Sequence, residues 1–425
     1  MQIIKYPLQN EWEGLIRRPS MDDTRLSDVV SGILDDVRQK GDEAVKMYGL
    51  KFDQVNLDDL SLSEAEKSEA DSLTKDLKQA ILQAKAHIEK FHAAQRQELP
   101  KIETCRGVIC WQKAVAIERI GLYIPGGTAP LFSTVLMLAV PAKIAGCKEI
   151  VLCTPPGKDG KIHPAVIFAA TAAGVDKIFK IGGVQAIGAM AYGTESVPKV
   201  YKIFGPGNQY VTTAKQIVGL KEVAIDMPAG PSEVEVIADE TAHPAFVASD
   251  LLSQAEHGAD SQVILLTTSE ELAESVAREV IAQLHALPRK ELAEKSLAHS
   301  RIIVLRTRDE IIELTNVYAP EHLIIETKDY QEIADRITNA GSVFLGHYTP
   351  ESAGDYASGT NHTLPTNGYA RMYSGVNLDS FMKKITFQEI SREGIRNLGP
   401  TIRILAENEQ LIAHKNAVSL RMFEG

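Results

Sequence analysis

The sequence has 425 residues and a formal net charge of −11 at pH 7, with 44% hydrophobic and 24% charged residues. This length and composition predict a globular protein of two or more domains and exclude a mainly disordered chain. The acidic balance argues against a nucleic-acid partner, because binding to the phosphate backbone depends on clustered Lys and Arg.

Neither the N-terminus nor any internal segment predicts secretion or membrane insertion. Residues 1–10 lack the apolar core of a signal peptide. The most apolar stretch, 133–147, is too short to span a bilayer and contains Pro141 and Lys143. We therefore expect a cytoplasmic protein with reduced thiols, since its four cysteines form no CxxC pair: Cys105, Cys110, Cys147 and Cys153.

The periodicity of apolar residues predicts alternating helices and strands. An amphipathic pattern over 63–97 predicts one long helix that stops before Pro100. Strands separated by helical patterns follow at 149–153, 177–181, 200–204 and 223–226. A second series covers 233–238, 262–267, 301–305, 322–326 and 342–345, with helices near 245–255 and 270–284. This alternation predicts βαβ units with parallel sheets in two α/β parts.

The two series meet at residues 228–231, where Pro and Gly predict a linker or a tight crossing. After about Phe381 the pattern becomes helical through Arg421. The loop 204–208 follows a strand and contains two glycines, as a phosphate-binding turn would, but Tyr210 stands where the third glycine of the dinucleotide fingerprint belongs. A nucleotide-binding loop, with Asp226 as ribose partner, and a plain βα turn both remain open.

Several polar residues have ligand or acid/base chemistry. Gln254 and His257 share one face at a helix end, Asp355 and His362 lie in a Gly- and Ser-containing loop after the strand 342–345, and His414 lies in a late helical pattern. Each taken singly fits a cap, a turn or a packed side chain. Together, two imidazoles, a carboxylate and an amide oxygen would form a nitrogen and oxygen site for zinc, manganese or cobalt.

Two further features bear on chemistry. Glu321 and His322 follow Pro320 at a loop-to-strand junction, where both side chains can reach one cleft. Glu can activate water and His can accept an alcohol proton near neutral pH. Cys153 at a strand end is an alternative thiolate nucleophile, but no helix start or basic neighbour favours its ionisation, so the sequence favours a buried thiol.

The chain resembles the histidinol dehydrogenase family along nearly its whole length. The resemblance rests on these ordered motifs: GLYIPGGTAP at 121–130, KIFGPGN at 202–208, MPAGPSE at 227–233, DLLSQAEHG at 250–258, NVYAPEHL at 316–323, GDYASGTNHTLPT at 354–366 and AHKNAVSLR at 413–421. One departure is Gln410, where the family often has glycine. The departure leaves Glu409 in place and puts only the local backbone shape in doubt.

The resemblance implies a site and a set of partners. Zinc, one ion per subunit, would be held by Gln254, His257, Asp355 and His414, with Glu321 and His322 as the catalytic acid/base pair. NAD would contact Tyr123, Gln185 and Asn208. The substrate L-histidinol would be bound by Ser232, Gln254, His257, His322, Asp355, Glu409 and His414.

The resemblance also implies the fold, an α/β architecture of two Rossmann-like parallel-sheet domains, one inserted in the other, with small N- and C-terminal helical segments. A homodimer with exchanged segments is expected, in which a partner supplies the tail bearing Glu409 and His414. The expected parts are an N-terminal segment 1–22, a first domain 23–122 plus 232–376 carrying the metal and catalytic residues, a second domain 123–231 with the NAD contacts, and a helical tail 377–425.

The implied activity is the oxidation of L-histidinol to L-histidine by two NAD in sequence, with His322 as general base and Glu321 activating water. Two alternatives stay open. One is a metal-independent aldehyde dehydrogenase that uses the Cys153 thiol. The other is a non-catalytic, metal-dependent binding protein of the same shape.

Overall fold

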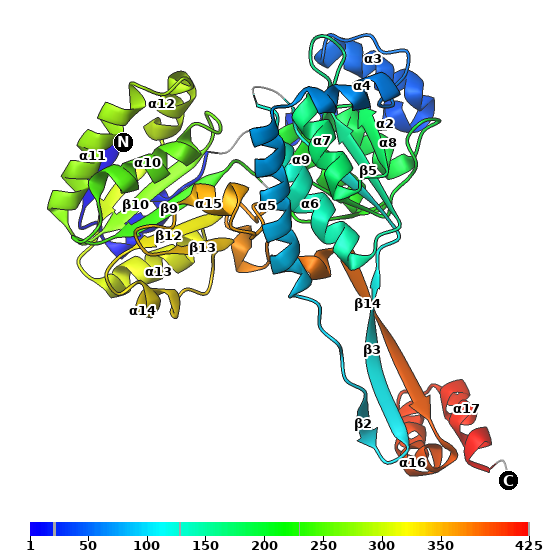
Figure 1. The fold of residues 1–425 in the computed structure, drawn as a ribbon. Coiled ribbons are helices and arrows are strands. Elements are labelled where there is room, and N and C mark those ends of the chain that lie inside the picture. The colour runs from blue at the N-terminus through cyan, green and yellow to red at the C-terminus, as the bar shows by residue number, and fades with distance from the viewer. Residues whose placement is uncertain (20–22, 127–128, 229, 424–425) are drawn as a thin grey trace.

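The computed structural model of the chain describes residues 1–19, 23–126, 129–228 and 230–423. Two parallel sheets with helices packed on their faces form the body, and an antiparallel ribbon tipped by two helices projects from it (Figure 1). The expected α/β class with two parallel-sheet domains is confirmed. Ala229 of the expected linker and Gly127 and Thr128 of the motif at 121–130 lie outside the described residues. Within the described ranges, every helix is too short or too polar to span a bilayer.

The larger sheet has six parallel strands in the order β1-β11-β10-β9-β12-β13. Its strands are β1 (Gln2–Lys5), β9 (Glu233–Ala238), β10 (Gln262–Thr267), β11 (Arg301–Val304), β12 (His322–Glu326) and β13 (Ser342–Leu345). Its helices are α1 (Trp12–Leu15), α10 (Pro244–Ala255), α11 (Glu270–Leu284), α12 (Lys290–Ala298), α13 (Arg308–Tyr318), α14 (Tyr330–Ala334) and α15 (Glu351–Tyr356). Alternate residues of β9 enter different cores, Val234 and Val236 with α10 and Ile237 with α13. The sheet is therefore buried on both faces, as parallel sheets usually are.

The second sheet has five parallel strands in the order β6-β5-β4-β7-β8. Its strands are β4 (Arg119–Tyr123), β5 (Glu149–Thr154), β6 (Lys177–Lys180), β7 (Lys202–Phe204) and β8 (Ala224–Ile225). The helices around it are α2 (Asp23–Lys40), α3 (Asp42–Phe52), α4 (Glu64–Glu69), α5 (Lys75–Ala93), α6 (Phe132–Ala145), α7 (Pro164–Ala173), α8 (Gly183–Tyr192) and α9 (Gln209–Gly219).

The projecting arm consists of β2 (Ile102–Cys105), β3 (Val108–Ala116), β14 (Met382–Ile390), α16 (Arg392–Asn408) and α17 (Ile412–Phe423). The strands pair antiparallel in the order β14-β3-β2, and β14 pairs with β3 along its whole length. The two helices pack on each other at the far end of this ribbon, away from both parallel sheets (Figure 1).

Four expectations about these segments differ from the structure. Much of 23–122 was assigned to the first domain, but Leu34 and Val37 of α2 and Ile88 of α5 pack in the cores of the five-stranded sheet. The single helix over 63–97 is α4 and α5, separated by a short 3-10 turn and an extended Leu73, because Ser63 and Thr74 each cap a helix start.

The two terminal segments also differ. The 1–22 segment is not simply helical, since β1 adds a parallel edge strand beside β11 of the same chain. The 377–425 tail is not wholly helical, because the nine residues of β14 precede its helices. Pairing with β3 accounts for this strand, whose side chains are mostly exposed.

Candidate active site and metal centre

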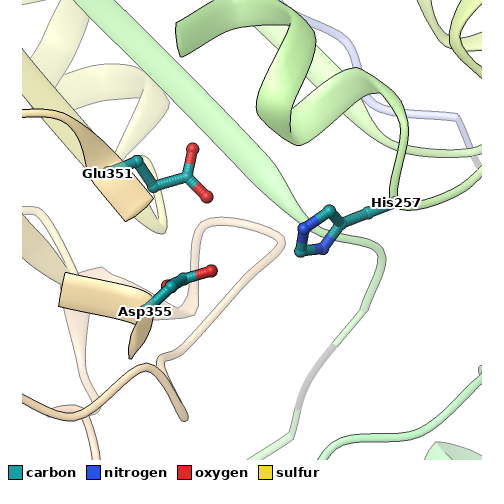
Figure 2. Close-up of side chains that lie close together, drawn as sticks. All are labelled: His257, Glu351 and Asp355. Carbon is teal, nitrogen blue, oxygen red and sulfur yellow. The ribbon is translucent and has the colours of Figure 1, made fainter. Parts of the chain in front are cut away.

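Two elements of the six-stranded domain place three ligand-type side chains together. His257 follows the end of α10, while Glu351 and Asp355 lie one turn apart on α15. One ligand atom from each of the three lies within 4.8 Å of the others. Figure 2 shows the imidazole facing the two carboxylates across a common space. The expected ligands His257 and Asp355 are thus close together, and Asp355 lies on a helix rather than in a loop.

Gln254 reaches the same place from the buried face of α10. With its amide nitrogen turned toward Glu351, it donates hydrogen bonds to both carboxylate oxygens, at 3.0 Å for Oε2. The amide oxygen then faces away from Glu351. Sequence reasoning missed Glu351, although its position four residues before Asp355 was a usable signal for a shared helix face.

The electrostatics of the cluster favour a cation. Burial, with Asp355 and Glu321 nearby, raises the pKa of Glu351 to about 8 despite the opposing effect of His322. Although burial opposes it, the neighbouring His322 imidazole holds the pKa of Asp355 below its usual value. Asp355 Oδ1 and His322 Nε2 are buried and have no hydrogen-bond partner. Carboxylate, imidazole and amide donors with unsatisfied atoms fit a divalent transition metal.

Glu321 and His322 lie beside this cluster, although regular strand geometry would direct neighbouring side chains to opposite faces. The two side chains can nevertheless point the same way because β12 begins at His322, and Glu321 lies in the turn before the strand. Glu321 Oε2 accepts a hydrogen bond from the Glu233 N–H at 2.8 Å. His322 Nδ1 lies 3.1 Å from the Glu233 carbonyl oxygen, which can only accept, so Nδ1 carries the proton of that bond.

The second imidazole nitrogen is therefore free for chemistry. His322 Nε2 lies 3.5 Å from Asp355 Oδ1. Burial works against protonation, but Glu321 and Glu351 together raise the pKa of His322 well above its usual value. Burial raises the pKa of Glu321, partly offset by the charge of His322. A cation bound by Asp355 and its neighbours would counter the carboxylate charges that hold this proton.

Other residues with expected roles are placed as follows. Ser232 immediately precedes β9 and is partly exposed. His362 lies under the cluster, with Nδ1 bonded to the Asp355 carbonyl at 2.9 Å and Nε2 3.0 Å from Thr134 Oγ1. The His362 side chain therefore helps to fix the position of the Asp355 backbone.

Glu409 and His414 are not brought to the cluster within one chain. Both are exposed on the projecting arm, which extends away from the six-stranded sheet (Figure 1). Gln410, at the position where a glycine was noted as common, has φ +60°. The turn thus keeps the left-handed conformation that glycine favours, at a cost of about 1 kcal/mol for a residue with a side chain.

The residues expected to contact NAD lie at the carboxyl edge of the five-stranded sheet. Tyr123 ends β4, and its hydroxyl accepts a hydrogen bond from the Gly183 N–H at 3.1 Å. Gln185 lies in the first turn of α8, with its buried amide oxygen unpaired. Asn208 caps the start of α9. Ligands of parallel α/β sheets gather at such an edge, but the Tyr123 and Gln185 side chains are themselves buried there.

Asp226 is not available as a ribose partner. Its carboxylate lies 2.5 Å from Lys215 Nζ and accepts from the N–H groups of Gly205 and Met227. Gly205 has φ +128°, and a Cβ there would lie 2.0 Å from the Tyr123 carbonyl oxygen. The glycine at position 205 is explained by the close approach of its backbone to the end of β4, and no bound phosphate is needed to explain it.

Cys153 is unsuited to nucleophilic catalysis. It is fully buried within β5, and burial raises the pKa of its thiol far above the usual value. A thiolate is the reactive form, so this environment disfavours the thiol-dependent alternative.

Comparison with known proteins gives one consistent family. A sequence model described as histidinol dehydrogenase matches residues 16–422. The chain is 64% identical over 425 residues to the histidinol dehydrogenase of Bacteroides fragilis, covering 100% of this chain and 99% of the relative. It is 53% identical over 415 residues to the chloroplastic histidinol dehydrogenase of Arabidopsis thaliana, covering 96% and 88%. The crystal structure of histidinol dehydrogenase from Elizabethkingia anophelis superposes with a TM-score of 0.97 at 56% identity, covering 99% and 98%.

Proposed function

The chain belongs to the histidinol dehydrogenase family, and from this premise we propose that it oxidises L-histidinol to L-histidine, the final step of histidine biosynthesis. The reaction would pass through L-histidinaldehyde, with two NAD molecules each accepting one hydride. The observation that carries the proposal is the meeting of His257, Asp355 and the Glu321–His322 pair in one cluster.

Gln254, His257, Asp355 and the partner subunit's His414 would hold one zinc ion per subunit. When bound, the ion supplies a fixed anchor for the imidazole and amino nitrogens of histidinol. The unpaired Asp355 Oδ1 and the proximity of the His257 and Asp355 ligand atoms support this assignment. Orienting a reactant in this way is worth roughly 7 to 11 kcal/mol in favourable cases.

In the first oxidation, His322 Nε2 takes the proton of the substrate hydroxyl while hydride leaves the carbinol carbon for the nicotinamide. The hydrogen bond from Nδ1 to the Glu233 carbonyl supports this role, because it keeps the second nitrogen available as the base. The products of this step are the aldehyde, NADH and a protonated His322.

In the second oxidation, Glu321 removes a proton from water as the water oxygen attacks the aldehyde carbon. His322, after losing its first proton to solvent, takes the hydroxyl proton of the hydrate as the second hydride departs. Oε2 of Glu321 lies 3.6 Å from Nδ1 of His322. Because the two side chains are this close, they can act on one substrate carbon in turn. Retaining the aldehyde at the site prevents its reaction with free amines.

A homodimer would complete each site. Because Glu409 and His414 are exposed on the arm, we propose that the partner's arm delivers them to the cluster, beside Ser232. Large apolar side chains exposed on the arm support this partnership: Ile404, Leu405, Ile412 and Leu420. The cofactor would lie along Tyr123, Gln185 and Asn208. Free thiols and the absence of a membrane span among the described helices support a cytoplasmic location.

Counting NADH per histidinol tests this function. The purified full-length chain is given limiting histidinol and excess NAD, with and without a metal chelator. We expect two NADH per histidinol, loss of activity on chelation and recovery on adding zinc. Zinc binding without NADH formation would favour a binding protein, and activity that survives chelation but is lost in Cys153→Ser would favour the thiol mechanism. Either result would reject the proposal.

A further inference from the structure

Glu233, the first residue of β9, touches both members of the Glu321–His322 pair through its main chain. Its N–H donates to Glu321 Oε2 at 2.8 Å, and its carbonyl accepts from His322 Nδ1 at 3.1 Å. The carboxylate and the imidazole therefore share one peptide segment as their support. Displacement of this segment would move both groups.

The Glu233 side chain is in turn held by Arg18, from the N-terminal segment. Arg18 Nη2 donates to Glu233 Oε2 at 2.8 Å, and Nε donates to Oε1. The Asn367 N–H also donates to Oε1, at 2.7 Å. Only 17% of the Arg18 side chain and 3% of the Glu233 side chain are exposed, so water cannot readily replace these bonds.

Arg18 also contacts the turn that leads into the pair. Its Nη2 donates to the Tyr318 carbonyl at 2.8 Å, and its guanidinium lies 4.1 Å from the centre of the Tyr318 ring. Ala319, the next residue, has φ +53°, which a residue with a side chain adopts only when its surroundings require it. The Arg18 guanidinium thus links β9, which supports the Glu321–His322 pair, to the turn after α13 that leads into this pair.

Stability alone does not explain this arrangement. Removing an ion pair from water costs about as much as the attraction returns, so a buried hydrophobic contact would stabilise the fold as well. The planar fork of arginine, however, fixes two carboxylate oxygens and a carbonyl in a defined geometry, which lysine cannot match. These contacts therefore indicate that the Glu233 carboxylate must be held in one defined position.

We propose that Arg18 and Glu233 are positioning residues for the Glu321–His322 pair, with the Arg18 guanidinium setting where the Glu233 peptide presents its N–H and carbonyl. This inference rests on the proposed function for its kinetic consequence. Its structural consequence, a Glu233 N–H held to Glu321, does not depend on the identity of the substrate.

The test compares Arg18→Met and Arg18→Lys with Arg17→Met, a matched control whose side chain is exposed. Arg18→Met should lower kcat by about 10- to 100-fold, since misplacing reacting groups by about 1 Å has this effect. Histidinol affinity and zinc content should stay near those of the control, whereas the melting temperature should fall because the buried Glu233 carboxylate loses its counter-charge. Arg18→Lys should fall between the two. Hydrogen exchange at the peptide spanning Glu233 should be faster in Arg18→Met than in Arg17→Met.

The contrary results are distinct. The inference is wrong if kcat of Arg18→Met stays within about twofold of the control, or if zinc content and histidinol affinity fall together with kcat, which marks a general structural role. If the wild-type chain fails to oxidise histidinol, the proposed function is wrong. The positioning role is then tested by the hydrogen-exchange comparison alone. Equal exchange in the two variants would then reject the positioning role.

Discussion

The carboxylate of Glu321 lies 3.6 Å from Nδ1 of His322. The two residues are adjacent in sequence, but they have different roles in the proposed mechanism. The carboxylate is held by the Glu233 N–H, while the imidazole directs Nε2 toward Asp355. In the proposed mechanism, these different directions allow Glu321 to act on water and His322 Nε2 to act on the substrate hydroxyl. They also make the two roles separable by mutation.

His322→Asn should slow both hydride transfers by about 100- to 10,000-fold, the usual range for losing a general base. Glu321→Gln should leave the first transfer within about tenfold of wild type and slow the second far more, because only the second needs activated water. Rapid-quench analysis of alcohol, aldehyde and acid separates the steps. Equal loss of both steps in Glu321→Gln would contradict this division of roles.

His257→Ala should weaken zinc affinity by more than about 100-fold, beyond the effect typical of losing an outer hydrogen-bonded group. The imidazole is one of three donors that lie within 4.8 Å of one another. Metal content after dialysis against a graded chelator measures the effect. His285→Ala, an exposed histidine on the surface, is the control. Similar zinc retention in the two variants would place the metal elsewhere.

Glu351→Gln should have a smaller effect, about tenfold in zinc affinity. The change removes an ionisable carboxyl group from the proposed metal site and one of the oxygens that accept from the Gln254 amide. Chelator competition against wild type gives the ratio. A loss as large as that of His257→Ala would instead make Glu351 a direct ligand.

Glu235 predicts a pH dependence of stability. Burial raises the pKa of Glu235 to about 8, although the hydrogen bond from Thr315 works in the opposite direction. The folded protein therefore keeps this proton at pH values where the unfolded chain has lost it. The stabilising contribution is complete below about pH 4.5 and is lost as pH rises through about 8.

Because Glu235→Gln stays neutral, its stability relative to wild type should grow between about pH 5 and 8, by on the order of 3 kcal/mol. Urea midpoints across this range provide the measurement. Glu240→Gln, at an exposed position, should follow wild type. Parallel curves for Glu235→Gln and wild type would show that Glu235 is ionised in the folded protein.

The strands of both parallel sheets were predictable because strands buried on two faces form continuous apolar runs. For example, β9 and β10 have the predicted bounds. The arm was not predictable in this way, because β14 is mostly exposed and has no continuous apolar run. The break between α4 and α5 was missed because Leu73 continues the apolar period, although Ser63 and Thr74 are typical helix caps.

The candidate site shows a similar limit. Motif resemblance identified His257 and Asp355, whose proximity depends on α10 and α15 lying side by side. Glu351 lies outside the family motifs, so its spacing of four residues from Asp355 was the sequence signal for it, and the structure shows that the two lie close together. The support given by Arg18 could not be read from the sequence, because 215 residues separate it from Glu233. The exposed positions of Glu409 and His414 likewise follow from the length and direction of the arm.

In the proposed dimer, each site combines the cluster of one subunit with the arm of the other. Mixing two variants that are each inactive tests this arrangement. Inactive His257→Ala and His414→Ala chains are unfolded together, refolded and assayed. Random pairing should restore about one quarter of wild-type activity, because half of the dimers are mixed and each mixed dimer has one intact site of two. No recovery, with mixed dimers demonstrated by tag-based purification, would contradict the shared site.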